Sequence, residues 1–434
     1  MIAQSEREQI VRLVRHWVVP AIGCTEPVCV ALAVARATEA LGHTPSHIEA
    51  ALSANILKNA MGVGIPGTGM VGLPIAIALG ATIGRSAYGL EVLRDCTPQA
   101  VEMAKTYIDT GAINITHKQD APAKLYVDIT VSDDAGHTAR TVISEEHTRF
   151  IVIEKDGKSL LQAPAADTTT AKDEESEAPL YHIPSLRTVY EFATTSPIEE
   201  LDFINEAARL NRNAARQSLN DNYGHCLGKT LSRPLGRGIM GESMFSHILS
   251  TTSAACDARM AGAMIPVMSN SGSGNQGICA TNPVSVFAEE NHNTPEETTR
   301  ALMLSHLTAI YIKQNLGTLS ALCGCVVAST GATCGITYLM GGDYEHVSFA
   351  VKNMIANITG MLCDGAKPSC ALKLTTGVST AVLSAMLAMQ GQHVTSVEGI
   401  IDDDVDKSIR NLVLIGHDAM NETDRCVLDI MTSK

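Results

Sequence analysis

The amino-acid sequence predicts an α+β protein that is predominantly α-helical, with closely packed helices and one small antiparallel β insertion. Apolar residues follow the helical period through most of the chain, whereas residues 124–162 switch to strict alternation. Aromatic residues make up only 4% of the chain and there are 34 glycines, so helices can approach one another closely. Strands and helices do not alternate along the chain, which argues against a βαβ protein.

Residues 1–120 are predicted to form an N-terminal helical part that carries the motif GCTEP. Candidate helices span residues 2–19, 27–41 and 91–110. Pro27 suits the first turn of a helix, because its missing N–H group would have no partner there.

The rest of the chain is predicted to contain three parts. Residues 121–165 form a small antiparallel meander, because polar residues alternate with Leu125, Val127, Ile129 and Val131. Residues 166–184 are polar and acidic, which indicates an exposed linker. From residue 185 to residue 434 the helical period returns, so this part is predicted to be a helical domain, and it carries the cysteines proposed below as ligands of a cluster.

Composition narrows the function classes. The formal net charge is −14, because 46 acidic residues outnumber 32 basic ones. A surface of that charge repels phosphate backbones, so we expect no nucleic acid as a partner. The N-terminus lacks the basic start and apolar run of a signal peptide, and twelve cysteines without a secretion signal favour a reducing compartment. We therefore expect a cytoplasmic protein, with a homo-oligomer left open.

One uncharged stretch, residues 317–340, is long enough to cross a bilayer. Gly, Ser, Thr and Cys are frequent in it, and no hydrophobic partner spans flank it. A buried core segment is the favoured interpretation, and we expect no membrane association.

The clearest chemical signal is the pair Cys363 and Cys370, seven residues apart. Gly365 and Pro368 stand between them, so the segment is predicted to be a loop that folds back on itself rather than a helix. Two thiolates on one loop are a common way to hold a metal or a cluster.

A third thiolate would come from elsewhere in the chain. Cys323 and Cys325 would point about 200° apart on a helix, so only one of them can face such a site. Cys334 and Cys279 are further candidates. Zinc sites favour closely spaced cysteine pairs in sets of four, whereas scattered cysteines on Gly-rich loops suit a [4Fe–4S] cluster better. Ordinary buried thiols are the alternative, because free cysteine is among the most buried residue types.

Cys24 stands just before Pro27 and therefore at the N-terminus of a predicted helix. Unpaired N–H groups and the helix dipole stabilise an anion there, which lowers the pKa of a thiol. Cys24 is thus a candidate thiolate base or nucleophile, and a loop cysteine without a task is the alternative. Cys29 falls inside the helix and is predicted to be core.

Two segments match G-x-G-x-x-G, residues 62–67 and 272–277. A dinucleotide site needs a strand before this motif, a helix after it and a βαβ frame. Pro66 lies inside the first segment, Pro283 follows the second closely, and no βαβ frame is predicted around either. The second loop suits a small anion, which its backbone N–H groups would bind, and a plain flexible loop is the alternative. Side-chain donors would be added by Ser269, Asn270, Ser271, Ser273 and Asn275.

Three motifs together resemble the L-cysteine desulfidase family, which is related to the α domain of bacterial iron–sulfur L-serine dehydratases. They are GCTEP at residues 23–27, SNSGSGNQG at 269–277 and MLCDGAK at 361–367. The motifs follow the family's order, and the resemblance covers nearly the whole chain.

The resemblance implies a [4Fe–4S] cluster held by three cysteines, one alone and a pair seven residues apart. Cys363 and Cys370 match the pair, and Cys323, forty residues before Cys363, matches the lone ligand. The catalytic proton acceptor maps onto Cys24. In the dehydratases the last two ligands are further apart, so the chain is more similar to the desulfidases.

The activity that the resemblance implies is a PLP-independent β-elimination of L-cysteine to sulfide, ammonia and pyruvate. One iron without a protein ligand would act as a Lewis acid on the β-substituent, and Cys24 would accept the α-proton. Ser271, Ser273 and Asn275 would hold the substrate carboxylate. Lys367 would tune the cluster or pair with that carboxylate, and a solvated loop lysine is the alternative.

Two other functions are weighed against L-cysteine desulfidation. The same mechanism acting on L-serine is the nearer one. A non-catalytic iron–sulfur redox sensor or amino-acid-binding protein is the alternative of another class.

Overall fold

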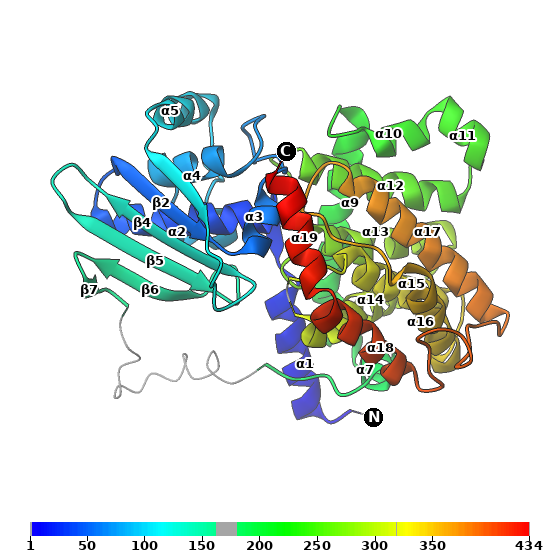
Figure 1. Ribbon diagram of the computed structural model, residues 1–434. Coiled ribbons are helices and arrows are strands. Elements are labelled where there is room, and N and C mark those ends of the chain that lie inside the picture. The colour runs from blue at the N-terminus through cyan, green and yellow to red at the C-terminus, as the bar shows by residue number, and fades with distance from the viewer. Residues whose placement is uncertain (1, 162–179, 318, 434) are drawn as a thin grey trace.

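The computed structural model describes residues 2–161, 180–317 and 319–433 of the chain. The protein has two lobes, a sheet lobe and a larger helical lobe, which lie on the left and right of Figure 1. The predicted class is confirmed, because helices dominate and most strands gather in one sheet.

The sheet lobe is a six-stranded sheet in the order β3-β2-β4-β5-β6-β7, covered by helices. Its strands are β2 (His47–Leu52), β3 (Ile113–His117), β4 (Tyr126–Ser132), β5 (Thr138–Ser144), β6 (Phe150–Lys155) and β7 (Lys158–Ser159). Its helices are α2 (Thr25–Leu41), α3 (Ala54–Ala60), α4 (Leu73–Thr82), the 3₁₀ helix η1 (Ser86–Glu91) and α5 (Pro98–Asp109). The predicted meander is present, because β4, β5 and β6 pair antiparallel in sequence order. The alternating residues Val127, Ile129 and Val131 are buried, and α2 packs on β4 and β5.

Strands also occur where the sequence predicts only helices. Within residues 1–120, β2 and β3 pair in parallel and are joined by a crossover that contains α3, α4 and α5. A parallel unit therefore surrounds the Gly-rich segment 62–67, contrary to the prediction. The segment follows helix α3 rather than a strand, so it lacks the arrangement of a dinucleotide fingerprint. Instead, the N–H group of Gly64 donates to the carbonyl oxygen of Met260 at 2.9 Å and ties the two lobes together.

The helical lobe holds most of the remaining chain. Its helices before β8 are α1 (Gln4–Trp17), α7 (Leu186–Thr195), α8 (Ile198–Leu201), η2 (Asp202–Ile204), α9 (Asn205–Asn220), α10 (Leu227–Ser232), α11 (Pro234–Met240) and α12 (Met244–Met260). Those after it are α13 (Gly274–Glu290), α14 (Pro295–Leu316), α15 (Gly324–Leu339), α16 (Tyr344–Ile358), α17 (Cys370–Met389), α18 (Val405–Leu414), the π-helix η3 (Ile415–Ala419) and α19 (Asn421–Thr432). The first helix, α1, packs on α14, so the chain starts in the helical lobe and crosses to the sheet lobe before α2.

The uncharged stretch 317–340 contributes α15, which is buried along almost its whole length, as the core interpretation predicts. Among the described residues, α17 alone is long and apolar enough to span a membrane, and 56% of its apolar window is buried inside the protein. A buried core helix can have the same length and apolar composition, so these two properties are weak evidence for a membrane span. The expected cytoplasmic location stays a prediction.

The predicted acidic linker, residues 166–184, lies mostly outside the described residues, which resume at Leu180. Ile183 is buried, and its N–H group donates to Oε1 of Gln314 at 3.0 Å, so the chain is already attached to the helical lobe there. The division of the chain at residues 120, 165 and 184 stays a prediction.

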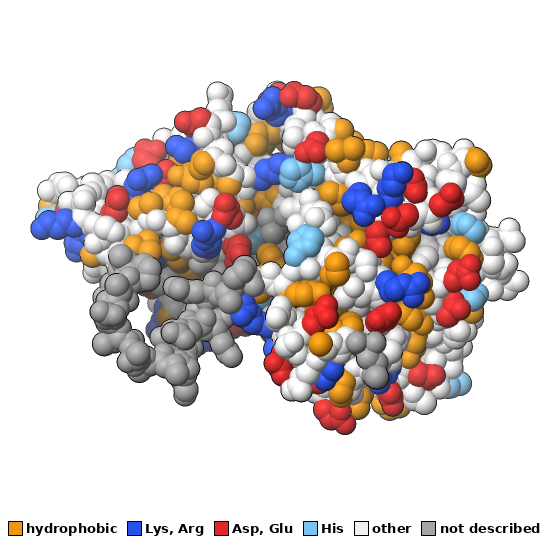
Figure 2. All heavy atoms as spheres, turned by 90° about the horizontal axis from the view of Figure 1, so that it is seen from below, with side chains coloured by type: hydrophobic (Ala, Val, Ile, Leu, Met, Phe, Trp, Pro, Cys, Tyr) orange, Lys and Arg blue, Asp and Glu red, His pale blue; other side chains and the backbone are white. Residues whose placement is uncertain are grey.

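Figure 2 shows acidic and basic side chains interspersed with hydrophobic ones over both lobes on the face in view. Such a mixture is typical of a solvated surface, whereas a nucleic-acid interface gathers basic side chains in one patch. The expectation of no nucleic-acid partner stays a prediction.

Two short antiparallel contacts join segments that are far apart in the sequence. Strand β1 (Pro20–Ile22) pairs with β8 (Pro266–Met268), and a single bridge joins Leu322 to Leu362. These contacts bring the candidate functional motifs together.

Candidate active site

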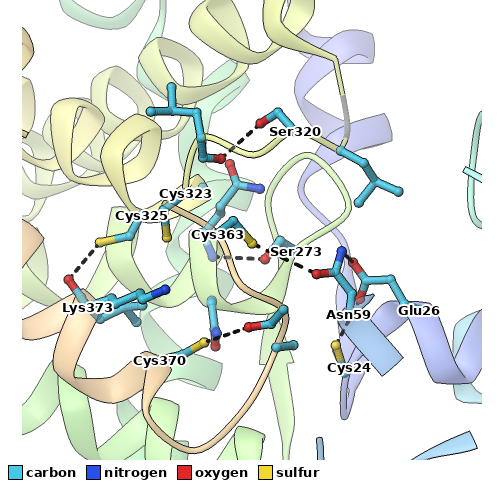
Figure 3. Close-up of a pocket in the computed structure, with 18 of the residues that line it drawn as sticks. Cys24, Glu26, Asn59, Ser273, Ser320, Cys323, Cys325, Cys363, Cys370 and Lys373 are labelled. Carbon is cyan, nitrogen blue, oxygen red and sulfur yellow. Dashed lines mark hydrogen bonds between the residues drawn. The ribbon is translucent and has the colours of Figure 1, made fainter. Parts of the chain in front are cut away.

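One cavity collects most of the candidate functional residues at the boundary between the lobes (Figure 3). It has a volume of about 90 Å³. The predicted residues that line it are Cys24, Ser273, Asn275, Cys323, Cys363 and Cys370. The cysteines of the helical lobe lie on one side, and Cys24 lies on the other with Glu26 and Asn59.

The β1–β8 ladder places the GCTEP motif beside the second Gly-rich loop. The N–H group of Ser269 donates to the carbonyl oxygen of Val19 at 2.9 Å, just before β1. Beyond the ladder, the hydroxyl of Thr25 donates to the carbonyl oxygen of Gly272 at 2.7 Å. Two motifs almost 250 residues apart are thereby fixed against each other.

The second Gly-rich loop leads directly into α13, which corrects the expectation that Pro283 would prevent a helix. Pro283 lies buried inside α13, where its missing N–H group removes one helical hydrogen bond without ending the helix. Ser273 is the N-cap residue, and its hydroxyl accepts from the N–H group of Gln276 at 3.4 Å. The loop thus presents a helix N-terminus to the cavity, a favourable place for an anion.

Cys323 and Cys363 are held together by the Leu322–Leu362 bridge. The N–H group of Cys323 donates to Met361 at 2.9 Å, and that of Cys363 donates to Ala321 at 2.7 Å. Residues 363–369 are not helical, as predicted, and α17 begins at Cys370.

The loop between Cys363 and Cys370 lies directly on α3. Gly365 has φ +90°, and a Cβ atom there would come within 2.2 Å of the carbonyl oxygen of Lys58. Only glycine fits this contact. The Nζ atom of Lys58 pairs with Asp424 of α19 at 2.5 Å and donates to the carbonyl oxygen of Cys363 at 3.3 Å. Helix α19 therefore stabilises the loop indirectly, through Lys58.

Cys325 also lines the cavity, although the helical angle predicts that only one of Cys323 and Cys325 could. Cys323 is the N-cap of α15, with extended backbone, so a helical angle does not relate the two side chains. The Cys325 thiol donates to the carbonyl oxygen of Lys373 at 3.2 Å.

Cys323, Cys363 and Cys370 all line the cavity and are the residues that would hold a metal or a cluster there. Burial raises the pKa of Cys323, and neighbouring Cys325 and Cys363 raise it further, so these sulfur atoms lie close enough to repel as thiolates. Burial also raises the pKa of Cys370. Among the described residues, however, no three His, Cys, Asp or Glu side chains are arranged to hold one metal ion.

Four helices begin at this cavity. Cys24, Ser273 and Cys323 are the N-cap residues of α2, α13 and α15, and Cys370 is the first residue of α17. Each N-terminus carries a partial positive charge that favours anions, such as thiolates or a carboxylate. The partial charges of these helix N-termini therefore favour negatively charged groups in the cavity.

Cys24 occupies the predicted helix terminus, but its pKa is raised rather than lowered. Burial is the main cause, and the negative charge of Glu26 adds to it. The Cys24 thiol donates to Oε2 of Glu26 at 2.9 Å, and the same carboxylate accepts from Asn59 at 3.3 Å. The Thr25 hydroxyl, which has a single proton, lies 3.1 Å from Oε2 and shares that proton between Glu26 and Gly272. Burial would raise the pKa of Glu26, but His147, the Cys24 hydrogen bond and Arg259 outweigh it and lower the pKa. The resting pair is a thiol and a carboxylate.

Six of the candidate residues do not line the cavity, namely Ser269, Asn270, Ser271, Cys279, Cys334 and Lys367. Ser271 is buried, and its hydroxyl donates to Oδ1 of Asn270 at 2.8 Å. Asn270 is held in turn by the buried His306. Lys367 points to Asp364, with its Nζ atom 2.6 Å from Oδ1.

Several polar residues of the cavity are not predicted from the sequence. They are Glu26, Asn59, Arg259, Gln276, Lys313 and Lys373. Glu26 could have been noticed, because it stands two residues after Cys24 within the same motif. Nothing local to Arg259 or Lys313 distinguishes them from ordinary helical residues. Burial lowers the pKa of Lys313 to about 8.

Comparison with known proteins places these features in a family. A family model described as the serine dehydratase alpha chain matches residues 87–429, which include Cys323, Cys363 and Cys370 but not Cys24. A UPF0597 protein of Bacteroides thetaiotaomicron is 65% identical over 431 residues, with 99% of each chain covered. UPF0597 proteins of Parabacteroides distasonis and Oleidesulfovibrio alaskensis are 58% and 46% identical, with at least 98% of each chain covered. The similarity to these relatives thus includes the GCTEP segment.

Proposed function

Because the chain belongs to the serine dehydratase alpha chain family, we propose that it is an iron–sulfur-dependent lyase that eliminates the β-substituent of a small amino acid. L-cysteine is the proposed substrate, with sulfide, ammonia and pyruvate as products. The observation that carries the proposal is the convergence of Cys24, Cys323, Cys363 and Cys370 on one cavity.

Cys323, Cys363 and Cys370 would hold a [4Fe–4S] cluster. Such a cluster, when bound by three thiolates, supplies a Lewis acid for the leaving β-substituent. In support, the contact of the loop with α3 and the Leu322–Leu362 bridge hold the backbone on either side of Cys323, Cys363 and Cys370. Four converging helix N-termini would stabilise the negative charge of the thiolates.

Cys24 and Glu26 would act together on the α-proton. In this proposal the thiol proton of Cys24 would pass to Oε2 of Glu26, which accepts its hydrogen bond at 2.9 Å. Because the pKa of Cys24 is raised and that of Glu26 is lowered, the transfer costs free energy, and the thiolate would form only transiently. The thiolate so formed takes the proton from the substrate Cα atom, and the electron pair of that bond expels the β-substituent. The N-terminus of α13, with Ser273 and Asn275, would attract the substrate carboxylate.

We propose L-cysteine rather than L-serine as the substrate, because Cys363 and Cys370 are seven residues apart, as in the desulfidases. Anaerobic purification followed by iron, acid-labile sulfide and visible absorbance measurements tests for the cluster. Sulfide release from L-cysteine, compared with pyruvate release from L-serine, tests the substrate. A colourless, iron-free protein after careful anaerobic preparation would refute the proposal.

Cys323 and Cys325 offer a matched pair of variants, because both line the cavity two residues apart. Cys323→Ser should lose the cluster, whereas Cys325→Ser should keep its iron. Equal iron loss in both variants would show that the ligand assignment is wrong.

Cys24→Ala separates catalysis from cluster binding. The variant should keep its iron and lose turnover of L-cysteine. Wild-type protein that binds iron but turns over neither L-cysteine nor L-serine would instead be a sensor or an amino-acid-binding protein.

A further inference from the structure

Two buried polar atoms that belong to residues lining the cavity have no hydrogen-bond partner among the described residues. They are Nε of Arg259 and Oε1 of Gln276, and each residue is only 3% exposed. Buried polar groups are nearly always paired in folded proteins, because an unpaired one loses its bonds to water without replacement. One of these atoms is a donor and the other an acceptor, so a ligand that pairs with both must carry both kinds of group.

Arg259 lies in the last turn of α12, against the start of α13. A Cβ atom at Gly274 would come within 2.3 Å of Nε of Arg259, so the missing side chain leaves the space that the guanidinium occupies. No carboxylate forms an ion pair with Arg259 in the part of the chain that the structure describes. A buried guanidinium that makes no direct ion pair, beside a helix N-terminus, suits an incoming carboxylate.

Gln276 lies in the first turn of α13, on the side of the cluster cysteines. A Cβ atom at Gly324 would come within 2.9 Å of its Cδ atom, which places the amide next to Cys323. Its unpaired Oε1 atom is an acceptor, and an ammonium group supplies donors.

We propose that Arg259 and Gln276 recognise the two charged groups of a free α-amino acid. Arg259 binds the α-carboxylate, and Oε1 of Gln276 accepts a hydrogen bond from the α-ammonium group. The proposal rests on the proposed function and deepens it, because it restricts the substrate to amino acids with both groups free. Between these contacts the Cα atom lies in a cavity with Cys24 on one side and the cluster cysteines on the other (Figure 3).

Three small probes test the two contacts separately. L-2-aminobutyrate carries both charged groups and has no leaving group, butyrate carries only the carboxylate, and propylamine carries only the ammonium. Calorimetric titration of reduced, cluster-free wild-type protein should show the tightest binding for L-2-aminobutyrate. Loss of either group should weaken binding by about 10- to 100-fold, the range for a hydrogen bond to a charged group.

Two variants should then give a crossed pattern. Arg259→Met should weaken L-2-aminobutyrate and butyrate by about 10- to 100-fold and leave propylamine unchanged. Gln276→Leu should weaken L-2-aminobutyrate and propylamine and leave butyrate unchanged. Arg212→Met is the control, because Arg212 pairs with Glu289 away from the cavity and should leave all three affinities unchanged.

The result can be separated from that of the proposed function. A crossed pattern in a protein that never binds iron would support the recognition of an amino acid and refute the lyase. Iron and turnover together with an equal loss for all three probes would refute the recognition and leave the lyase. If a variant does not fold, the ratio of the three probe affinities on wild type decides, and similar affinities would overturn the proposal.

Discussion

Replacing Glu26 by Gln should make the Cys24 thiol a stronger acid. The negative charge of Glu26 opposes a thiolate, and its Oε2 atom accepts from the Cys24 thiol at 2.9 Å. Glutamine has nearly the same volume and can still bond to Thr25 and Asn59, but it carries no charge. The variant therefore removes one cause of the raised pKa of Cys24 and leaves burial, the larger cause, in place.

The size of the effect follows from the lost interaction. A hydrogen bond to a charged group contributes about 1.5–3 kcal/mol, and one pKa unit corresponds to about 1.4 kcal/mol. The pKa of Cys24 should therefore fall by about 1–2 units in the variant. At a pH below that pKa the thiolate fraction rises tenfold per unit, so alkylation of Cys24 should be about 10- to 100-fold faster.

Peptide mass spectrometry of anaerobic, cluster-free protein treated with iodoacetamide at neutral pH would measure this rate. The exposed Cys426 serves as the internal reference in the same sample. Glu200→Gln is the control variant, because Glu200 pairs with Arg7 far from the cavity. An unchanged or slower alkylation of Cys24 relative to Cys426 would refute the account of this pair. Turnover should fall in the same variant, because the acceptor of the thiol proton is lost.

Three further variants test buried side chains that can carry a charge. Burial lowers the pKa of His306 to about 3, so as pH falls below about 6.5 only the unfolded chain gains the proton and stability drops. In His306→Gln, the loss in the free energy of unfolding at about pH 5.5 should be smaller by about 1.4 kcal/mol. Urea denaturation midpoints of both proteins at that pH measure the difference. Lys313→Met should raise the melting temperature of cluster-free protein, because burial lowers the pKa of Lys313 to about 8. Lys58→Met should lower it, because Asp424 loses its buried partner, a loss of about 3–5 kcal/mol.

The parts of the site that sequence predicts correctly are those with a local cause. Gly365 and Pro368 exclude a helix whatever surrounds them, so the loop between Cys363 and Cys370 could be predicted. Pro27 likewise places Cys24 at a helix terminus. The roles of all the predicted residues stay proposals, because position alone does not show which molecule binds.

Features that depend on the surroundings could not be predicted. Two opposing effects act on the pKa of Cys24. The helix terminus lowers it and contributes about 0.3–1 kcal/mol, whereas burial raises it and can shift a pKa by several units. Arg259 stands out only because it lacks a partner in the folded chain. Strand β2 is not predicted because only Ile48 and Leu52 among its buried residues are large, and Ala51 on the opposite face is as apolar as the buried Ala50, so the alternation is weak.

The order in which the chain is synthesised gives the long-range contacts of the site a further consequence. Cys24 is synthesised before its neighbours in β8, α15 and α17, which follow hundreds of residues later. Asp424, which pairs with Lys58 beside the loop between Cys363 and Cys370, is added after all of them. At about 5–20 residues per second, the roughly 400 residues between Cys24 and Asp424 take about 20–80 seconds to add. A nascent chain has no complete cavity during that interval. In the proposed function, iron would therefore enter the cavity only after α19 has been added, and a chain that stops before α19 would keep bare thiols.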